Sequence, residues 1–126
     1  MSERIPFQTA DAPKPAGPYS QAIRSGGLLF LAGQGPFLPD GSKVEGAFDE
    51  QARQTFRNLE AVANAAGASL GDAVRVGVYL RDMSDFAAMN AMYVEFFRDP
   101  MPARTTIQAN LSGFDIEVDA VIAIKD

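Results

Sequence analysis

Two charged residues near the C-terminal end have the side chains that a metal-free hydrolysis of a small acid requires. Arg104 opens an alternating stretch that follows "MPA", and Glu117 lies near the start of the next such stretch. An arginine fork binds a carboxylate through two parallel hydrogen bonds, and a glutamate can orient a water molecule or transfer a proton. If the two stretches pair or lie close, both side chains line one pocket. A second interpretation stays open, in which they only pair with one another or with solvent.

The composition removes several competing chemistries. The 126 residues include no cysteine and no histidine, which excludes disulfides, thiolate nucleophiles, Ser-His-Asp triads and histidine-ligated zinc sites. The net charge of −5 argues against a nucleic-acid partner. The N-terminus lacks the pattern of a signal peptide, and the apolar run at 28–32 is too short to span a membrane. We therefore predict a cytoplasmic protein whose chemistry needs no metal.

The elements that must position these residues form a single predicted domain over 1–126. Alternation with a period of two predicts strands, and apolar residues at three- and four-residue steps predict two amphipathic helices. The prolines among the first eighteen residues predict an extended, irregular start. The strands are predicted at 19–24, 28–32, 74–81, 105–111 and 116–124, and the helices at 48–66 and 86–96.

This order of elements predicts an α+β domain, in which two helices pack on one face of a mixed sheet. The alternation puts Thr105 and Ile107 on one face of their strand and Thr106 and Gln108 on the other. We expect Thr106 and Gln108 to share the uncovered face of the sheet with Glu117. Because two helices cannot cover both faces, that second face is suited to a partner subunit.

Five segments together resemble the Rid (YjgF) family of enamine and imine deaminases. They are "AGPYSQA" (16–22), "AGQGP" (32–36), the segment 51–97, "PART" (102–105) and "IEVDAVIAI" (116–124). The resemblance implies a chorismate-mutase-like α+β fold, a homotrimer and pockets between subunits. It also implies a cofactor-free hydrolysis of 2-enamine or 2-imine acids, such as 2-aminoacrylate and 2-iminobutyrate, to 2-keto acids and ammonia.

The resemblance implies a role for three catalytic residues. Arg104, in "PAR", matches the arginine that binds the substrate carboxylate and places the chain in the deaminase subgroup. Glu117 matches the glutamate that positions the attacking water. Tyr19, in "GPY", matches a tyrosine whose hydroxyl helps hold that water or the nitrogen, although a half-buried rim aromatic is an equally simple interpretation.

Four further positions are predicted to bind the substrate. The resemblance implies contacts from the main chain of Thr106 and from Ala32 and Gly33 in the "AGQGP" loop. Phe86 is most simply a core residue that could also touch a ligand. Ala32 stands where many active members have serine, and one lost hydrogen bond to a charged group costs about 1.5–3 kcal/mol. Gly35 replaces a usual apolar residue, so we expect a wider pocket there.

Two other functions stay open at this stage. A member that binds small carboxylates without turnover, or acts like a chaperone, is suggested by the missing hydroxyl at Ala32. A ribonuclease is a label that some family members carry. The acidic balance and the missing histidine count against it.

Overall fold

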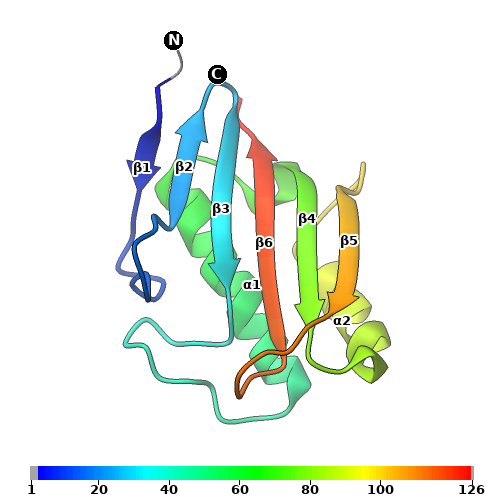
Figure 1. Cartoon of the computed structure of the whole chain (residues 1–126). Helices are drawn as coiled ribbons and strands as arrows, with labels where there is room; N and C mark the ends of the chain where they lie inside the picture. The colour runs from blue at the N-terminus through cyan, green and yellow to red at the C-terminus, as the bar shows by residue number, and fades with distance from the viewer. Residues whose placement is uncertain (1–2, 126) are drawn as a thin grey trace.

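The computed structural model describes residues 3–125, which form a six-stranded mixed sheet and two α-helices (Figure 1). The strand order is β1-β2-β3-β6-β4-β5, and only the β4–β5 pair is parallel. This confirms the predicted α+β class. The elements are β1 (Ile5–Phe7), β2 (Ala22–Ser25), β3 (Leu28–Gln34), α1 (Phe48–Ala65), β4 (Ala73–Leu80), α2 (Phe86–Tyr93), β5 (Ala103–Gln108) and β6 (Ile116–Ala123).

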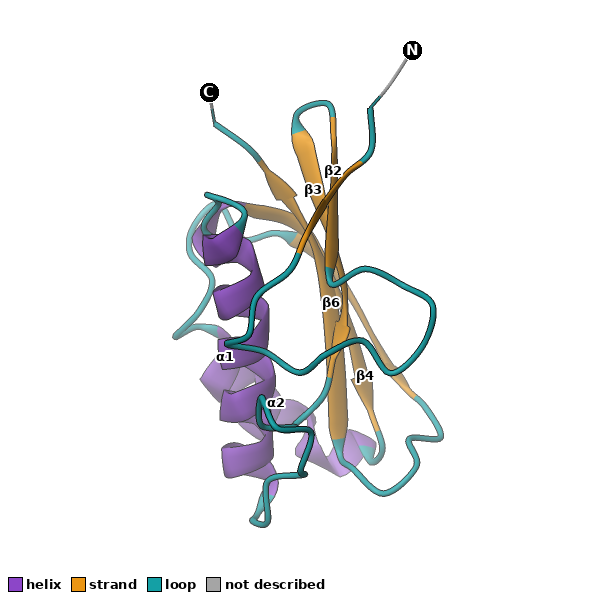
Figure 2. Cartoon of the chain, turned by 90° about the vertical axis from the view of Figure 1, so that its left-hand side faces the viewer, coloured by secondary structure: helices purple, strands orange, loops and turns teal. Residues whose placement is uncertain are grey.

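Both helices lie on the same face of the sheet, as the edge-on view shows (Figure 2). The apolar stripe of α1 supplies Phe56, Leu59 and Val62 to the core, and each is almost fully buried. The helix packs on β3 and β6, whose inward side chains include Leu29 and Val118. The core therefore lies between α1 and the centre of the sheet, and no helix of residues 3–125 lies over the opposite face.

The alternation of buried and partly exposed residues along β6 confirms the prediction. Ile116 and Val118 are buried against the helices, whereas Glu117 and Asp119 point to the face without helices. We call this second face the open face. Its exposed apolar residues include Leu28 and Phe30 on β3 and Ile107 on β5.

The faces of β5 are the reverse of the prediction. Its register with β4 places Arg104 beside Val76, Thr106 beside Val78 and Gln108 beside Leu80, whose β4 side chains are all buried under the helices. Thr106 and Gln108 therefore lie on the helix face, and Thr105 and Ile107 lie on the open face. Alternation shows which residues share a face, but on an edge strand it does not show which face is covered.

The remaining differences are at the ends of elements. The segment predicted to be irregular contains β1, which pairs with β2 in antiparallel fashion. The strand predicted from Tyr19 begins at Ala22, and the second helix ends at Tyr93. Among residues 3–125 no helix is long and apolar enough to cross a membrane.

Candidate active site

Glu117 lies on the open face of β6 and packs directly on the backbone of β3. A Cβ atom added to Gly33 would lie 2.6 Å from Oε2 of Glu117, so only glycine leaves room for the carboxylate here. The register between β3 and β6 shifts between Leu31 and Gln34, which marks a bulge at this point. Burial raises the pKa of the half-buried Glu117, and the nearby charge of Asp119 raises it further. The carboxyl group thus sits where a protonated form is less costly than in water.

Tyr19 and Gly33 line the same cavity as Glu117, so the structure brings together three of the predicted residues. The cavity has a volume of about 280 Å³. The Tyr19 hydroxyl oxygen accepts a hydrogen bond of 3.0 Å from the backbone N–H of Ala16. Its own hydrogen is then available to another acceptor.

Two aromatic rings form part of the cavity wall. Phe37 and Phe114 both line the cavity. A Cβ at Gly35 would lie 2.9 Å from the Phe37 ring and 3.3 Å from the Phe114 ring. The rings occupy the place of a side chain at 35, so the expectation of a wider pocket is wrong. The spacing of Phe37 after the "AGQGP" loop is the signal that could have located it.

Ala32 is held in the strand just before this cavity. Its N–H donates a hydrogen bond of 2.9 Å to the carbonyl oxygen of Gln21. Among the described residues that line the cavity, Gly33 is present and Ala32 is not. A contact between Ala32 and a ligand therefore stays a prediction.

Arg104 lies on the opposite side of the sheet, under α2. Its Cζ is 4.7 Å from the centre of the Tyr93 ring and 5.6 Å from that of the Phe86 ring. Its Nη1 is 3.8 Å from Sδ of Met89. The contacts with the two rings are cation–π interactions, which orient a guanidinium without using its hydrogen-bond donors. One Nη1 donor points to Sδ of Met89, and the other donors of the guanidinium stay available for an anion.

A shallow cavity opens beside Arg104. It has a volume of about 270 Å³, and Asn90, Tyr93 and Met101 are among its lining residues. Within residues 3–125, the buried hydroxyl oxygens of Tyr93 and Thr106 have no hydrogen-bond partner. The side chain of Thr106 is thus turned toward the helices, and its main chain is part of edge strand β5.

Within one chain Arg104 and Glu117 do not share a pocket. Strand β4 separates β5 from β6, and the two residues stand beside Val76 and Tyr79 of β4, respectively. Strand spacing and rise put their Cα atoms roughly 14 Å apart, and their side chains leave opposite faces of the sheet. This also excludes an ion pair between them in one chain. The expected single pocket is therefore absent from residues 3–125 taken alone.

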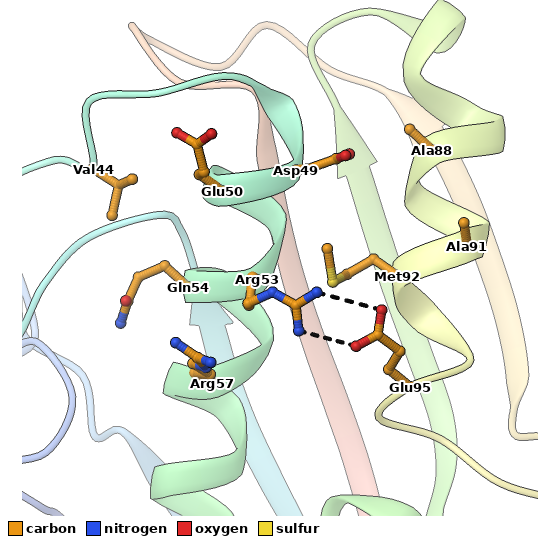
Figure 3. A pocket seen from close by; sticks show the side chains of 10 residues that line it. All are labelled: Val44, Asp49, Glu50, Arg53, Gln54, Arg57, Ala88, Ala91, Met92 and Glu95. Atoms are coloured by element: carbon orange, nitrogen blue, oxygen red, sulfur yellow. Dashed lines mark hydrogen bonds and ion pairs between the residues drawn. The ribbon is translucent and has the colours of Figure 1, made fainter.

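A larger groove of about 420 Å³ runs between α1 and α2 on the outer side of the helix layer (Figure 3). Arg53 of α1 donates hydrogen bonds of 3.0 and 3.4 Å to Glu95, which lies two residues beyond the end of α2. Both side chains are exposed, so this ion pair contributes little stability. None of the predicted site residues in the described part of the chain lines this groove.

The fold and sequence match one known family. Residues 9–124 match the family model described as Endoribonuclease L-PSP. This chain belongs to the YjgF/Rid family. A RutC family protein of Pyrococcus horikoshii is 47% identical over 116 residues, which cover 90% of this chain and 92% of that protein.

Two further relatives of this Rid family member have more specific names. A 2-iminobutanoate/2-iminopropanoate deaminase of Dermatophagoides farinae is 38% identical over 128 residues, which cover 99% of this chain and 100% of that protein. The crystal structure of RidA from the Antarctic bacterium Psychrobacter sp. PAMC 21119 has a TM-score of 0.89 and 37% identity, and the match covers 96% of this chain and all of that one.

Proposed function

We propose that this protein is a 2-imine acid deaminase of the subgroup that carries the "PAR" arginine. The reaction adds water to R–C(=NH)–COO⁻ and gives R–CO–COO⁻ and ammonia, with R as the substrate side chain. The observation that carries the proposal is the half-buried Glu117, which shares one cavity with Tyr19 and Gly33. The deaminase name of the Dermatophagoides farinae relative supports the same chemistry.

In this proposal Glu117 moves protons between water and the nitrogen. The ionised carboxylate takes a proton from a water molecule while the water oxygen attacks the imine carbon. The protonated form then gives that proton to the nitrogen, which completes a carbinolamine. Glu117 next takes the proton of the carbinolamine hydroxyl and passes it to the nitrogen, so the C–N bond breaks, the carbonyl forms and ammonia leaves. A carboxyl group whose pKa is raised by burial serves both steps better than an exposed one.

Tyr19 and Arg104 position the reactants. The Tyr19 hydroxyl accepts from Ala16, so it can donate its own hydrogen to the water or to the nitrogen. Arg104 binds the substrate carboxylate with the donors that its aromatic contacts leave available. The main chain of Thr106 and the ring of Phe86 complete the binding site beside it. No metal or cofactor enters this scheme.

We also propose a homotrimer, because in one chain Arg104 and Glu117 lie on opposite faces of the sheet. Each face therefore carries only one of the two groups that the site needs. The open face exposes Leu28, Phe30 and Ile107. Covering this face with a second subunit buries apolar area and can place Arg104 of one subunit near Glu117 of the next. A closed ring of three such contacts makes three equivalent sites. A cytoplasmic location and the lack of a nucleic-acid partner stay predictions.

The test follows the release of 2-ketobutyrate while a threonine dehydratase generates 2-iminobutyrate. We expect the wild-type protein to accelerate release and Arg104→Ala to give no acceleration. Arg53→Ala is the matched control, because Arg53 is an exposed arginine of α1 that lines a different groove. Equal rates with and without wild-type protein would contradict the proposal.

A second function is favoured by one residue. Ala32 provides no hydroxyl to the ligand, so a member that binds small carboxylates without turnover is the alternative. Saturable binding of 2-ketobutyrate without any effect on imine hydrolysis would select it.

A further inference from the structure

Phe37 and Phe114 form a continuous aromatic wall in the cavity that contains Glu117. Their ring centres are 5.3 Å apart, and the ring planes meet at 72°, an edge-to-face arrangement. Both rings lie against Gly35, where an added Cβ would collide with the Phe37 ring and press on the Phe114 ring. Among the described residues that line the cavity, the only charged ones are Lys14 and Glu117. The wall itself is therefore apolar and uncharged.

The Phe37 part of the wall is fixed from behind by a buried carboxamide of α1. The Nδ2 of Asn58 donates hydrogen bonds to the carbonyl oxygens of Gly35, at 3.1 Å, and Phe37, at 2.7 Å. Asn58 is fully buried, and its Oδ1 accepts a hydrogen bond of 2.9 Å from Gln54. These bonds fix the backbone on both sides of Pro36, so the Phe37 ring has a preset position.

The Phe114 part of the wall is fixed on both sides of the ring. Lys43 donates a hydrogen bond of 2.8 Å to the carbonyl oxygen of Gly113. The Gln51 carboxamide accepts from the N–H of Asp115 at 2.9 Å and donates to its carboxylate at 3.1 Å. Asp115 also pairs with Arg81 at 2.6 Å. The loop that carries Phe114 is thus tied to α1 and to the end of β4, and the wall is preorganised.

We propose that this wall is the subsite for the substrate side chain and that it selects 2-imine acids with a large uncharged side chain, aromatic or branched aliphatic. This inference rests on the proposed function. With the imine carbon near Glu117 and Tyr19, a substituent on that carbon lies in the same cavity as the two rings. A phenyl or isobutyl group covers the two rings and removes apolar surface from water, whereas a methyl group leaves the rings exposed to solvent. A charged side chain would lose its hydration against the rings, which offer it no hydrogen-bond partner.

The test compares imines that differ only in the side chain. An L-amino-acid oxidase converts alanine, leucine or phenylalanine to the imine while it reduces oxygen to hydrogen peroxide, which catalase removes. Semicarbazide traps the imine that is not hydrolysed, so a lower semicarbazone signal measures hydrolysis. For wild type we expect kcat/KM to be at least about tenfold higher with the phenylalanine imine than with the alanine imine.

Variants of the wall should remove this preference. Phe37→Val should bring the ratio of the two kcat/KM values to within about threefold, mainly through loss on the phenylalanine imine. Leu38→Val, in the same loop, is the matched control and should keep the wild-type ratio, because Leu38 does not line the described cavity. Phe114→Leu provides a second variant if Phe37→Val does not fold. An unchanged ratio in both wall variants, or a wild-type preference for the alanine imine, would overturn the inference.

A binding measurement separates this inference from the proposed function. If wild type hydrolyses no imine, the deaminase proposal fails, and titration calorimetry with phenylpyruvate and pyruvate then tests the subsite alone. We expect phenylpyruvate to bind at least about tenfold more tightly, and we expect Phe37→Val to reduce that difference. Equal affinities in wild type would overturn the subsite, whatever the outcome of the hydrolysis assay.

Discussion

Strands β5 and β6 each carry one of the two charged residues proposed to act on the substrate, but they present them in opposite directions. Arg104 of edge strand β5 is turned toward α2, and Glu117 of inner strand β6 is turned to the open face. Both strands alternate in sequence. The difference shows that alternation groups residues, while the position of a strand in the sheet decides which group is covered.

The two residues are also held in place by different interactions. Aromatic rings of α2 stack on Arg104, whereas Glu117 lies against a glycine backbone in a cavity whose loops are hydrogen-bonded to α1. In each arrangement the charged group, the guanidinium of Arg104 or the carboxyl of Glu117, can still contact a ligand. In the proposed trimer, each would be half of a site that a neighbouring subunit completes.

The largest expected effect is the recovery of activity when two inactive variants are mixed. Arg104→Ala and Glu117→Gln should each lose at least about 100-fold in kcat/KM, since one removes a charge-assisted carboxylate anchor and the other the proton carrier. In randomly mixed trimers, about a quarter of the sites pair an intact Arg104 with an intact Glu117 from the neighbour. Co-expression of differently tagged variants, purification of mixed trimers and the 2-ketobutyrate assay measure this recovery.

Two outcomes would break the comparison in different ways. Mixed trimers without any recovery would mean that Arg104 and Glu117 act within one chain. That result would contradict a site shared between subunits, which their positions on opposite faces of the sheet suggest. A purified wild-type protein that stays monomeric and active would show that no second subunit is needed. Trimers of a single variant serve as the control for residual activity.

The second prediction concerns the pH dependence of Glu117. Its pKa is raised above the usual 4.5, chiefly by burial, so the ionised base is lost at a higher pH than for an exposed glutamate. We expect wild-type kcat/KM to fall on the acid side with an apparent pKa above about 4.5, and the residual rate of Glu117→Gln to lack this fall. An acid limb that survives in the variant would assign the titration to another group.

Much of the fold could be predicted from the sequence, because its signals are local. The stripe of α1 and the alternation of β6 each concern residues whose spacing directly reflects one buried face. The three-residue β1 carries no such signal and gains its hydrogen bonds only from β2. The covered face of β5 depends on where α2 packs, which its own six residues do not contain.

The candidate site was predictable by residue type but not by arrangement. The resemblance assigned Tyr19, Gly33 and Glu117 separately, and the structure places them in one cavity. The effect of Gly35 was misread because it depends on two rings that lie against it, Phe37 and the sequence-distant Phe114. Compensation of this kind between distant residues requires the tertiary structure.

A smaller effect is expected from a methyl group beneath Glu117. In Gly33→Ala the new Cβ would lie 2.6 Å from Oε2 of Glu117, so the carboxylate must move. We expect kcat to fall by about tenfold with little change in Tm, because the displaced atoms end a flexible side chain. Gly27→Ala is the matched control, since a Cβ there meets nothing within 4 Å. Equal kcat in both variants would mean that the present position of Glu117 is not the reactive one.

The hydrogen-bonded support of the Glu117 cavity should be visible in stability. Asn58→Ala leaves the part-buried carbonyls of Gly35 and Phe37 without their donor, which should lower the free energy of unfolding by about 1–3 kcal/mol. Asn64→Ala, at an exposed position of the same helix, should change it by less than about 0.5 kcal/mol. Denaturant titration at one protein concentration compares the two, and equal losses would remove the special role of Asn58.

The smallest effect is expected on the Arg104 side, where the support is chiefly stacking, with one long hydrogen bond to Sδ of Met89. Within the described residues the Tyr93 hydroxyl is buried without a partner, so Tyr93→Phe should leave stability unchanged or slightly raise it. Tyr93→Leu removes the ring 4.7 Å from Arg104 and should weaken binding of 2-ketobutyrate by about 0.5–1 kcal/mol, roughly two- to fivefold. Calorimetry on both variants makes the comparison. Weaker binding by Tyr93→Phe would instead show that the hydroxyl, and not the ring, acts on Arg104 or on the ligand. Arg104 would then be held by hydrogen bonding, like the loops of the Glu117 cavity.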